Sequence, residues 1–133
     1  MKLLEIEGIG PAYAEKLTAA GIKSIEKLLE AGSTPKGRKE VAAKSGIADS
    51  HILEWVNRAD LFRVKGVGSE YGDLLEASGV DTVVELAVRK AENLTKKMAE
   101  VNAQKKLVRQ LPSEKQVAAW IEHAKTLPRV VTY

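Results

Sequence analysis

The sequence repeats itself, and this internal repeat limits the fold more than any other feature. When the chain is shifted by 58 residues, residues 8–30 align with residues 66–88, and seven of the 23 positions are identical. Self-similarity of this kind indicates one supersecondary unit that occurs twice. Glycines and core-type residues dominate the identities, so a backbone path is what repeats. The identical pairs are Gly8/Gly66, Gly10/Gly68, Tyr13/Tyr71, Leu17/Leu75, Ala19/Ala77, Gly21/Gly79 and Leu28/Leu86.

The match resumes near the end of each half with a larger shift. At a shift of 65, residues 52–56 align with residues 117–121, which places Trp55 opposite Trp120. The second half therefore carries an insertion of seven residues, between about residues 98 and 112. The two tryptophans sit on apolar helix faces, where packing explains them better than base stacking. The predicted repeats cover residues 1–61 and 62–133.

Helix signals occur along both halves, and no alternating strand pattern of useful length is present. Pro11 suits the first turn of a helix that Gly21 ends. Asn93 is a candidate cap for a helix in the second half, and Asn102 either caps another or lies inside one continuous helix. Side chains with N-cap or capping-box spacing are Ser24, Thr34, Thr82 with Glu85, and Ser113 with Gln116.

The composition excludes several classes of site. The chain of 133 residues has no cysteine, so disulfides, thiolate metal sites, iron–sulfur clusters and cysteine nucleophiles are excluded. His51 and His123 do not correspond in the repeat, so we expect no shared metal site, no catalytic pair and no cofactor. No stretch approaches the ~20 apolar residues of a membrane span, and acid appears early, at Glu5. We therefore expect a soluble cytoplasmic protein with no membrane partner.

Each repeat contains a helix-hairpin-helix pattern. The first is Leu4-x-Ile6-x-Gly8-Ile9-Gly10, the second is Phe62-x-Val64-x-Gly66-Val67-Gly68, and both continue into a helix. Two glycines around one buried aliphatic residue let the chain turn tightly and leave the first N–H groups of the next helix pointing outward. The predicted fold class is all-α, with two tandem helix-hairpin-helix repeats packed as one compact pseudo-twofold domain.

Outward amides at a helix start form an anion site suited to a nucleic-acid phosphate. Two such hairpins could grip phosphates on both sides of a groove without reading bases. In families that carry this motif, sequence-independent DNA binding is the usual role, and the resemblance also implies a monovalent cation held by hairpin carbonyls. The local charge is mixed, because acidic residues including Glu7 and Glu70 flank the hairpins.

The chain also resembles one family over essentially its whole length. This is a bacterial family of tandem helix-hairpin-helix proteins catalogued as a domain of unknown function. The resemblance supports the fold and implies no established activity. The stretches that carry it include Ile52-Leu53-Glu54-Trp55-Val56-Asn57, Ala59-Asp60-Leu61-Phe62-Arg63, Glu100-Val101-Asn102, Lys106-Leu107-Val108-Arg109 and Leu127-Pro128-Arg129-Val130-Val131-Thr132-Tyr133.

Positive charge gathers in one segment of the second half. The formal net charge of the chain is +3, but residues 89–109 hold seven bases and two acids and so carry +5. This segment either extends a phosphate-binding surface or is an ordinary solvated helix face. The predicted nucleic-acid-binding residues are Gly8, Gly10, Lys16, Arg63, Lys65, Gly66, Gly68, Lys96, Lys97, Lys105, Lys106 and Arg109.

No catalytic constellation is recognisable. The sequence lacks a Ser/His/Asp series in a nucleophile context, a phosphate loop with its lysine, and carboxylates in a metal-ligand pattern. We therefore expect no enzymatic activity. Two functions stay open: sequence-independent binding of double-stranded DNA through hairpin amides and the basic segment, and a protein-interaction or scaffold module that uses the same fold without phosphates.

Overall fold

The computed structural model describes all 133 residues, and it is entirely helical. It contains eight α-helices, one short 3₁₀ helix and no strand, so the all-α prediction is confirmed. The chain divides into two compact units. The first unit consists of Met1–Asp60 together with Val130–Tyr133, and the second of Leu61–Arg129. No helix is long and apolar enough to cross a membrane.

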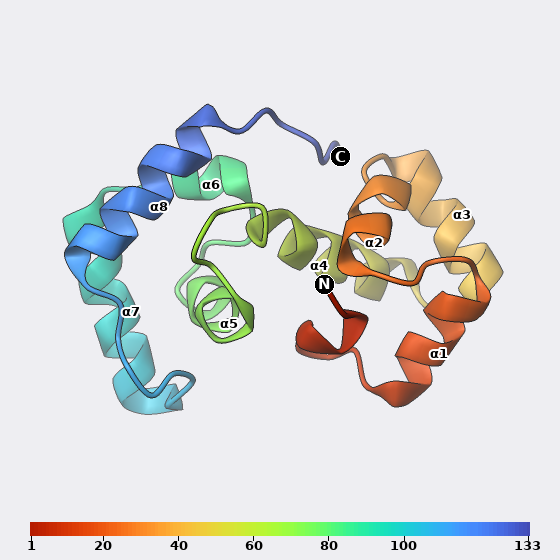
Figure 1. The fold of residues 1–133 in the computed structure, drawn as a ribbon, viewed down its shortest axis with the longest axis horizontal. Helices are drawn as coiled ribbons and strands as arrows, with labels where there is room; N and C mark the ends of the chain where they lie inside the picture. Colours follow the sequence, from red (N-terminus) through yellow and green to blue (C-terminus); the bar gives the residue numbers. More distant parts are fainter. The chain divides into compact units, whose positions relative to one another are not determined.

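The first unit is a cluster of short helices (Figure 1). Helix α1 packs against α3 and against the 3₁₀ helix, and α2 packs against α3. Its core holds buried aliphatic side chains around Trp55. The elements are η1 (Leu3–Glu5), α1 (Pro11–Ala19), α2 (Ile25–Ala31), α3 (Pro35–Ser45) and α4 (Asp49–Leu61), the last of which runs up to the boundary between the units.

The last four residues of the chain complete the first unit. The Thr132 N–H donates to the Ser33 carbonyl at 2.8 Å. The guanidinium of Arg38, 7% exposed, donates to the Gly32 carbonyl at 2.9 Å and to the Thr132 carbonyl at 2.7 Å. Val131 is buried beside these bonds. This terminal segment is thus held by backbone hydrogen bonds and by a buried cation that already has its partners.

The second unit is built around α8. This helix packs against α6 and α7, and α5 packs against α7. Figure 1 shows α8 running alongside both neighbours. Leucine, valine and methionine side chains from all four helices surround Trp120 in one buried cluster. The elements are α5 (Ser69–Ala77), α6 (Val83–Ala87), α7 (Ala91–Lys105) and α8 (Glu114–Thr126).

The predicted Ser and Thr caps are confirmed. The hydroxyls of Ser24, Thr34 and Thr82 each accept from the backbone N–H three residues later. Ser113 and Gln116 form the full reciprocal capping box. The capping box at Thr82 is incomplete, because the Glu85 carboxylate accepts a hydrogen bond from the Thr82 hydroxyl and not from the Thr82 backbone N–H. Local chemistry therefore fixes the start of four helices.

The prediction of Asn93 as a helix cap is wrong. Helix α7 begins at Ala91, and its N-cap is Lys90, which makes no side-chain capping bond. The Leu94 N–H already donates to the Lys90 carbonyl at 2.9 Å, so Asn93 lies within the first helical turn and not before it. Leu94 and Met98, one turn apart on this helix, are both buried. Asn102 lies inside this one helix, and its amide bonds both the N–H and the carbonyl of Val108.

The added length of the second half lies at the end of α7 and after it. Helix α7 has 15 residues against 11 in α3. Residues 106–113 connect α7 to α8, whereas residues 46–48 suffice between α3 and α4. The Asn102 bonds to Val108 hold the start of this longer connection against the helix.

Candidate functional site

The two glycine turns, residues 7–10 and 65–68, have the same backbone. Gly8 has φ +96° and Gly66 has φ +92°, a region that favours glycine. The backbone bonds around them also recur 58 residues apart in the sequence. Ile9 N–H donates to the Ile6 carbonyl and Val67 N–H to the Val64 carbonyl, both at 3.1 Å. The sequence repeat thus corresponds to a repeated local geometry.

A buried tryptophan lies behind each turn. Trp55 is 2% exposed and Trp120 is 4% exposed, which confirms the prediction that both are buried. A Cβ added to Gly8 would lie 3.3 Å from Trp55 Nε1, and one added to Gly66 would lie 2.9 Å from Trp120 Nε1. The indole therefore packs against the glycine itself, and a side chain there would press into it.

Each tryptophan also contacts the tyrosine of the following helix. The ring centroids of Tyr13 and Trp55 are 5.1 Å apart, as are those of Tyr71 and Trp120. Both pairs are inclined rather than parallel, an arrangement that aromatic rings favour. The indoles are thus enclosed by their own units and present no free face for base stacking.

The second glycine of each turn is the N-cap of a helix. Gly10 directly precedes α1 and Gly68 directly precedes α5, and neither helix start has a side-chain capping bond. Both glycines have negative φ, and a Cβ at either would meet nothing within 4 Å. Packing within the chain therefore does not require glycine at these two positions. The missing side chain leaves the start of each helix open to an approaching group.

The two helix starts differ in the N–H donors they contain. The first residue of α1 is Pro11, which has no N–H, whereas the first residue of α5 is Ser69, which has one. The N-terminus of a helix attracts anions through its backbone amides and its dipole. The second turn therefore has one more backbone donor in its first helical turn than the first.

Basic side chains gather differently at the two turns. Lys65 is exposed in the second turn, and Arg63 lies two residues before it and is half-buried. At the first turn, the exposed Lys16 lies on α1 with its ammonium 5.8 Å from the centre of the Tyr13 ring. The equivalents of Arg63 and Lys65 in the first turn are Glu5 and Glu7. The second turn is thus the more positive of the two.

The predicted basic residues of the insertion region lie on another element, α7 and the loop after it. Lys96 and Lys97 are exposed on α7, and Lys96 pairs with Glu92 at 3.4 Å. Lys105 follows Lys96 by about two and a half turns and so lies on the opposite side of the helix. These cations therefore surround α7 rather than forming one stripe.

The last two predicted cations follow the helix. Lys106 closes α7 in the left-handed conformation, with φ +51°. Arg109 is exposed in the loop. Helix α5, which begins at the second turn, packs against α7, so turn and basic helix belong to one packed unit.

Sequence reasoning missed the role of His123. Its Nδ1 accepts the Lys65 N–H at 2.9 Å, so α8 holds the second turn directly. His51, the other histidine, is exposed and stacks on Trp55, with ring centroids 5.6 Å apart. No sequence signal marked this bond, because the repeat alignment pairs His123 with Arg58.

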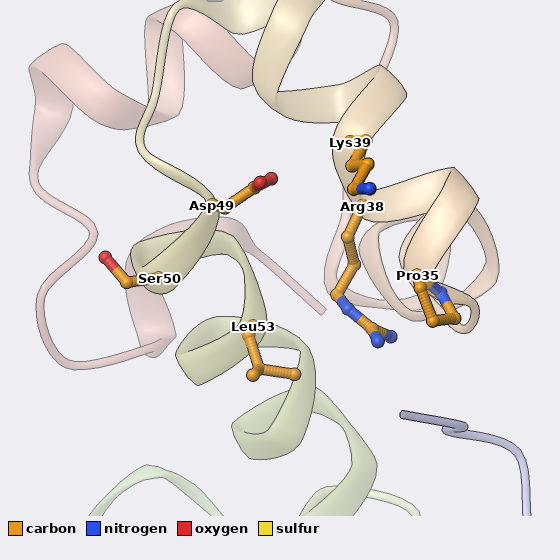
Figure 2. Close-up of a pocket in the computed structure, with 6 residues that line it drawn as sticks. All are labelled: Pro35, Arg38, Lys39, Asp49, Ser50 and Leu53. Atoms are coloured by element: carbon orange, nitrogen blue, oxygen red, sulfur yellow. The ribbon is translucent and has the colours of Figure 1, made fainter.

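Each unit also contains a cavity away from its glycine turn. The cavity of the first unit, about 260 Å³, lies between the starts of α3 and α4. Figure 2 shows Lys39 of α3 and Asp49 of α4 at this cavity, with the Arg38 guanidinium at its side. Its charges are mixed, and Arg38 is already bound to two carbonyls. The lining of this cavity therefore does not indicate whether a ligand would be an anion or a cation.

The cavity of the second unit, about 330 Å³, lies between the start of α7 and one face of α8. It is lined by Arg89, Lys90 and Lys125, and also by Glu122. The ammonium of Lys125 and the carboxylate of Glu122 are 3.1 Å apart, so they partly neutralise each other. In neither unit are three or more His, Asp or Glu side chains grouped to hold a metal ion.

These features describe an all-α protein whose two units each contain a glycine turn backed by a buried tryptophan. A family model described as "Domain of unknown function (DUF4332)" matches residues 7–127, and the chain belongs to this family. No curated protein and no solved structure matches the chain.

Proposed function

We propose that this protein binds double-stranded DNA without sequence preference, and that the second glycine turn is its main phosphate contact. In this proposal the two units are tandem helix-hairpin-helix repeats, as in the bacterial family that the sequence resembles. The protein acts as a binding module in the cytoplasm and not as an enzyme. Arg63, Lys65 and the bases on and after α7 supply the surrounding positive charge.

The observation that carries the proposal is the absence of a side-chain cap at the start of α5. Four helices of the chain are capped by a Ser or Thr hydroxyl, whereas α5 begins at Gly68 with no side-chain cap. Nothing in the protein would obstruct a Cβ there, so the glycine keeps the helix start open toward the outside. A phosphate oxygen suits such a start, because it is a hydrogen-bond acceptor and because the positive end of the helix dipole attracts its negative charge.

The electrostatic part of the proposal rests on the bases near the second turn. Lys65 and Lys96 are exposed, and contacts of such residues with phosphates release counterions from DNA. Binding of this type has a dissociation constant of about 10⁻⁴ to 10⁻⁶ M near physiological salt and weakens steeply as salt rises. Reversing the charge of Lys65, Lys96, Lys97, Lys105 and Lys106 should lower both the affinity and the salt dependence.

The decisive variant is Gly68→Asp, measured by fluorescence anisotropy with duplex DNA from about 50 mM salt upward. Gly68 has the extended backbone of an N-cap, so the aspartate can bond the first amides of α5 and repel phosphate. We expect folding stability to be unchanged or slightly higher while DNA affinity falls. A loss of affinity without a loss of stability separates phosphate binding from a folding effect.

Gly10→Asp is the matched control. It makes the same change at the equivalent N-cap, where Pro11 removes one donor and Glu7 stands in place of Lys65. We expect it to reduce DNA affinity less than Gly68→Asp does. Equal affinities for the wild type and both variants would rule out the glycine turns as the contact. Absence of any binding at about 50 mM salt would refute the proposed function.

A protein-interaction role is the second candidate, and exposed apolar side chains on α6 favour it. Val84 is 43% exposed and Val88, four residues later at the end of the same helix, is 77% exposed. Two valines at this spacing lie on one side of a helix and could dock on a partner. Co-purification that is insensitive to salt and is lost in Val84→Lys and Val88→Lys variants would support this role.

A further inference from the structure

The bond between Lys65 and His123 ties the second glycine turn to α8. The Lys65 N–H donates to His123 Nδ1 at 2.9 Å. One turn earlier on α8, Trp120 packs against Gly66. Two side chains of α8 therefore hold two consecutive residues of the turn, one by a hydrogen bond and one by packing.

The hydrogen bond requires a neutral imidazole. Nδ1 can accept a hydrogen bond only when it carries no proton of its own, so this contact selects the tautomer with the proton on Nε2. A histidine side chain takes up a second proton in the range of about pH 5 to 8. The protonated ring would present an N–H to the Lys65 N–H, and two donors cannot bond each other.

The first unit has no such device. In the alignment that pairs Trp55 with Trp120, the position of His123 is occupied by Arg58. In the alignment of the two glycine turns, which has a shift of 58, the position of Lys65 is occupied by Glu7. A guanidinium has only donors, so it cannot accept a backbone N–H. The first turn is therefore held from α4 by its tryptophan without this hydrogen bond.

We propose that His123 is a positioning residue of the second glycine turn and that its protonation releases this turn. Neutral His123 holds the Lys65 amide and thereby fixes the approach to Gly66 and Gly68. The consequence for DNA rests on the proposed function, whereas the release of the turn does not. Glu122 and Lys125 on α8 pair with each other. The charged side chains of the second turn and of α5 are Arg63, Lys65, Glu70, Asp73 and Glu76. Those of the two helices packed against α8 are Glu85 on α6 and Glu92, Lys96, Lys97, Glu100 and Lys105 on α7.

The first experiment follows the Lys65 amide by NMR in the full chain, without DNA. The amide is observed at pH 7.5 and at pH 5. In the wild type, we expect both its proton shift and its protection from solvent exchange to be smaller at the lower pH. His123→Asn places an amide oxygen near the position of Nδ1, so protection should persist at both pH values. His123→Leu has no acceptor, so protection should be lost at both.

His51→Leu is the matched control, because it removes the other histidine and leaves the Lys65 bond intact. Its Lys65 amide should titrate as in the wild type. A Lys65 amide that does not respond to pH in the wild type would overturn the proposal. So would equal protection in the Asn and Leu variants of His123, with folding confirmed by circular dichroism.

The second experiment measures duplex DNA binding at pH 7.5 only, because at lower pH the added imidazolium charge would itself attract phosphate. We expect His123→Leu to bind about two- to tenfold more weakly than the wild type, the range that one net hydrogen bond corresponds to, and His123→Asn to bind like the wild type. Equal affinity of the Leu variant would contradict the link to DNA. If no variant and no wild type binds, the proposed function is wrong, and the amide titration still decides the role of His123.

Discussion

The two glycine turns have the same backbone and different surroundings. Gly8 and Gly66 share a positive φ, a buried tryptophan behind the glycine and the same pattern of backbone bonds. The surroundings of the second turn include the His123 bond, and two bases stand where the first turn has two acids. The turn geometry is thus set by glycine and by the core, whereas the charge and the additional hydrogen bond around each turn are set by residues outside the core.

The largest expected effect tests what the turns share. Trp55→Ala and Trp120→Ala each remove a buried indole that packs against a turn glycine, so each should lower the free energy of unfolding by about 3–5 kcal/mol. Denaturant titration of both variants measures this. A loss below about 1 kcal/mol in either would show that the indole does not support its turn.

The next effect separates the turns by their packing. Gly66→Ala and Gly8→Ala both force a side chain onto a positive φ, which costs about 1–3 kcal/mol. The added Cβ would lie 2.9 Å from Trp120 at Gly66 and 3.3 Å from Trp55 at Gly8. Gly66→Ala should therefore lower the stability more than Gly8→Ala does. Thermal melts of the pair provide the measurement, and the reverse order would refute the difference in packing.

A smaller effect concerns the C-terminal ends of two equivalent helices, α3 in the first half and α7 in the second. Helix α3 ends at Gly46 with φ +73°, whereas α7 ends at Lys106 with φ +51°. A left-handed lysine is strained by about 1–2 kcal/mol, and a glycine there loses about 0.5–1 kcal/mol of chain entropy. Lys106→Gly should therefore raise stability by up to about 1 kcal/mol, and Gly46→Ala should lower it.

The same Lys106→Gly variant also tests the basic segment. If Lys106 contacts a phosphate, its loss should reduce the slope of log affinity against log salt by about one. An unchanged slope together with a more stable fold would indicate that Lys106 contributes no phosphate contact. That result would favour the reading of this segment as an ordinary solvated surface.

The smallest effect is a pH dependence found in the first unit. A hydrogen bond from the N-terminal ammonium, helped by a backbone bond, lowers the pKa of Glu26 below its usual 4.5. A carboxyl with a lowered pKa in the folded state adds stability above the unfolded value and loses it as pH falls. Glu26→Gln should therefore be slightly less stable than the wild type at pH 6. The difference should fade below about pH 4.5, and a difference that grows in acid would contradict this assignment.

The sequence could predict those parts of the fold that depend on neighbouring residues. Ser24, Thr34 and Ser113 cap helices because each hydroxyl can accept a hydrogen bond from the backbone N–H only three residues later in the chain. Trp55 and Trp120 could be placed in the core from helical periodicity and from the repeat. Asn93 failed as a cap because α7 begins at Ala91 after Lys90, which makes no side-chain capping bond, so no capping residue in the sequence marks this start.

The candidate site was predictable only in part, for a physical reason. Glycine spacing reveals a turn, since few other residues allow its backbone. The partner of the Lys65 amide depends on how α8 packs, and the two residues are 58 apart in the chain. Likewise, the bonds from Arg38 to the terminal segment join residues 94 apart, which no local pattern indicates. Long-range hydrogen bonds of this kind become visible only in the folded structure.

The division of the first unit has a consequence for the order of events during synthesis. A ribosome makes the chain from its N-terminus, so residues up to Asp60 emerge long before Val130–Tyr133, which belong to the same unit. The second unit, Leu61–Arg129, is a continuous insertion into the first and can form from residues already made. Until Thr132 has been made, Arg38 lacks one of its two carbonyl acceptors. Of the two units, the one whose first residues are made earlier is therefore the one that is completed later.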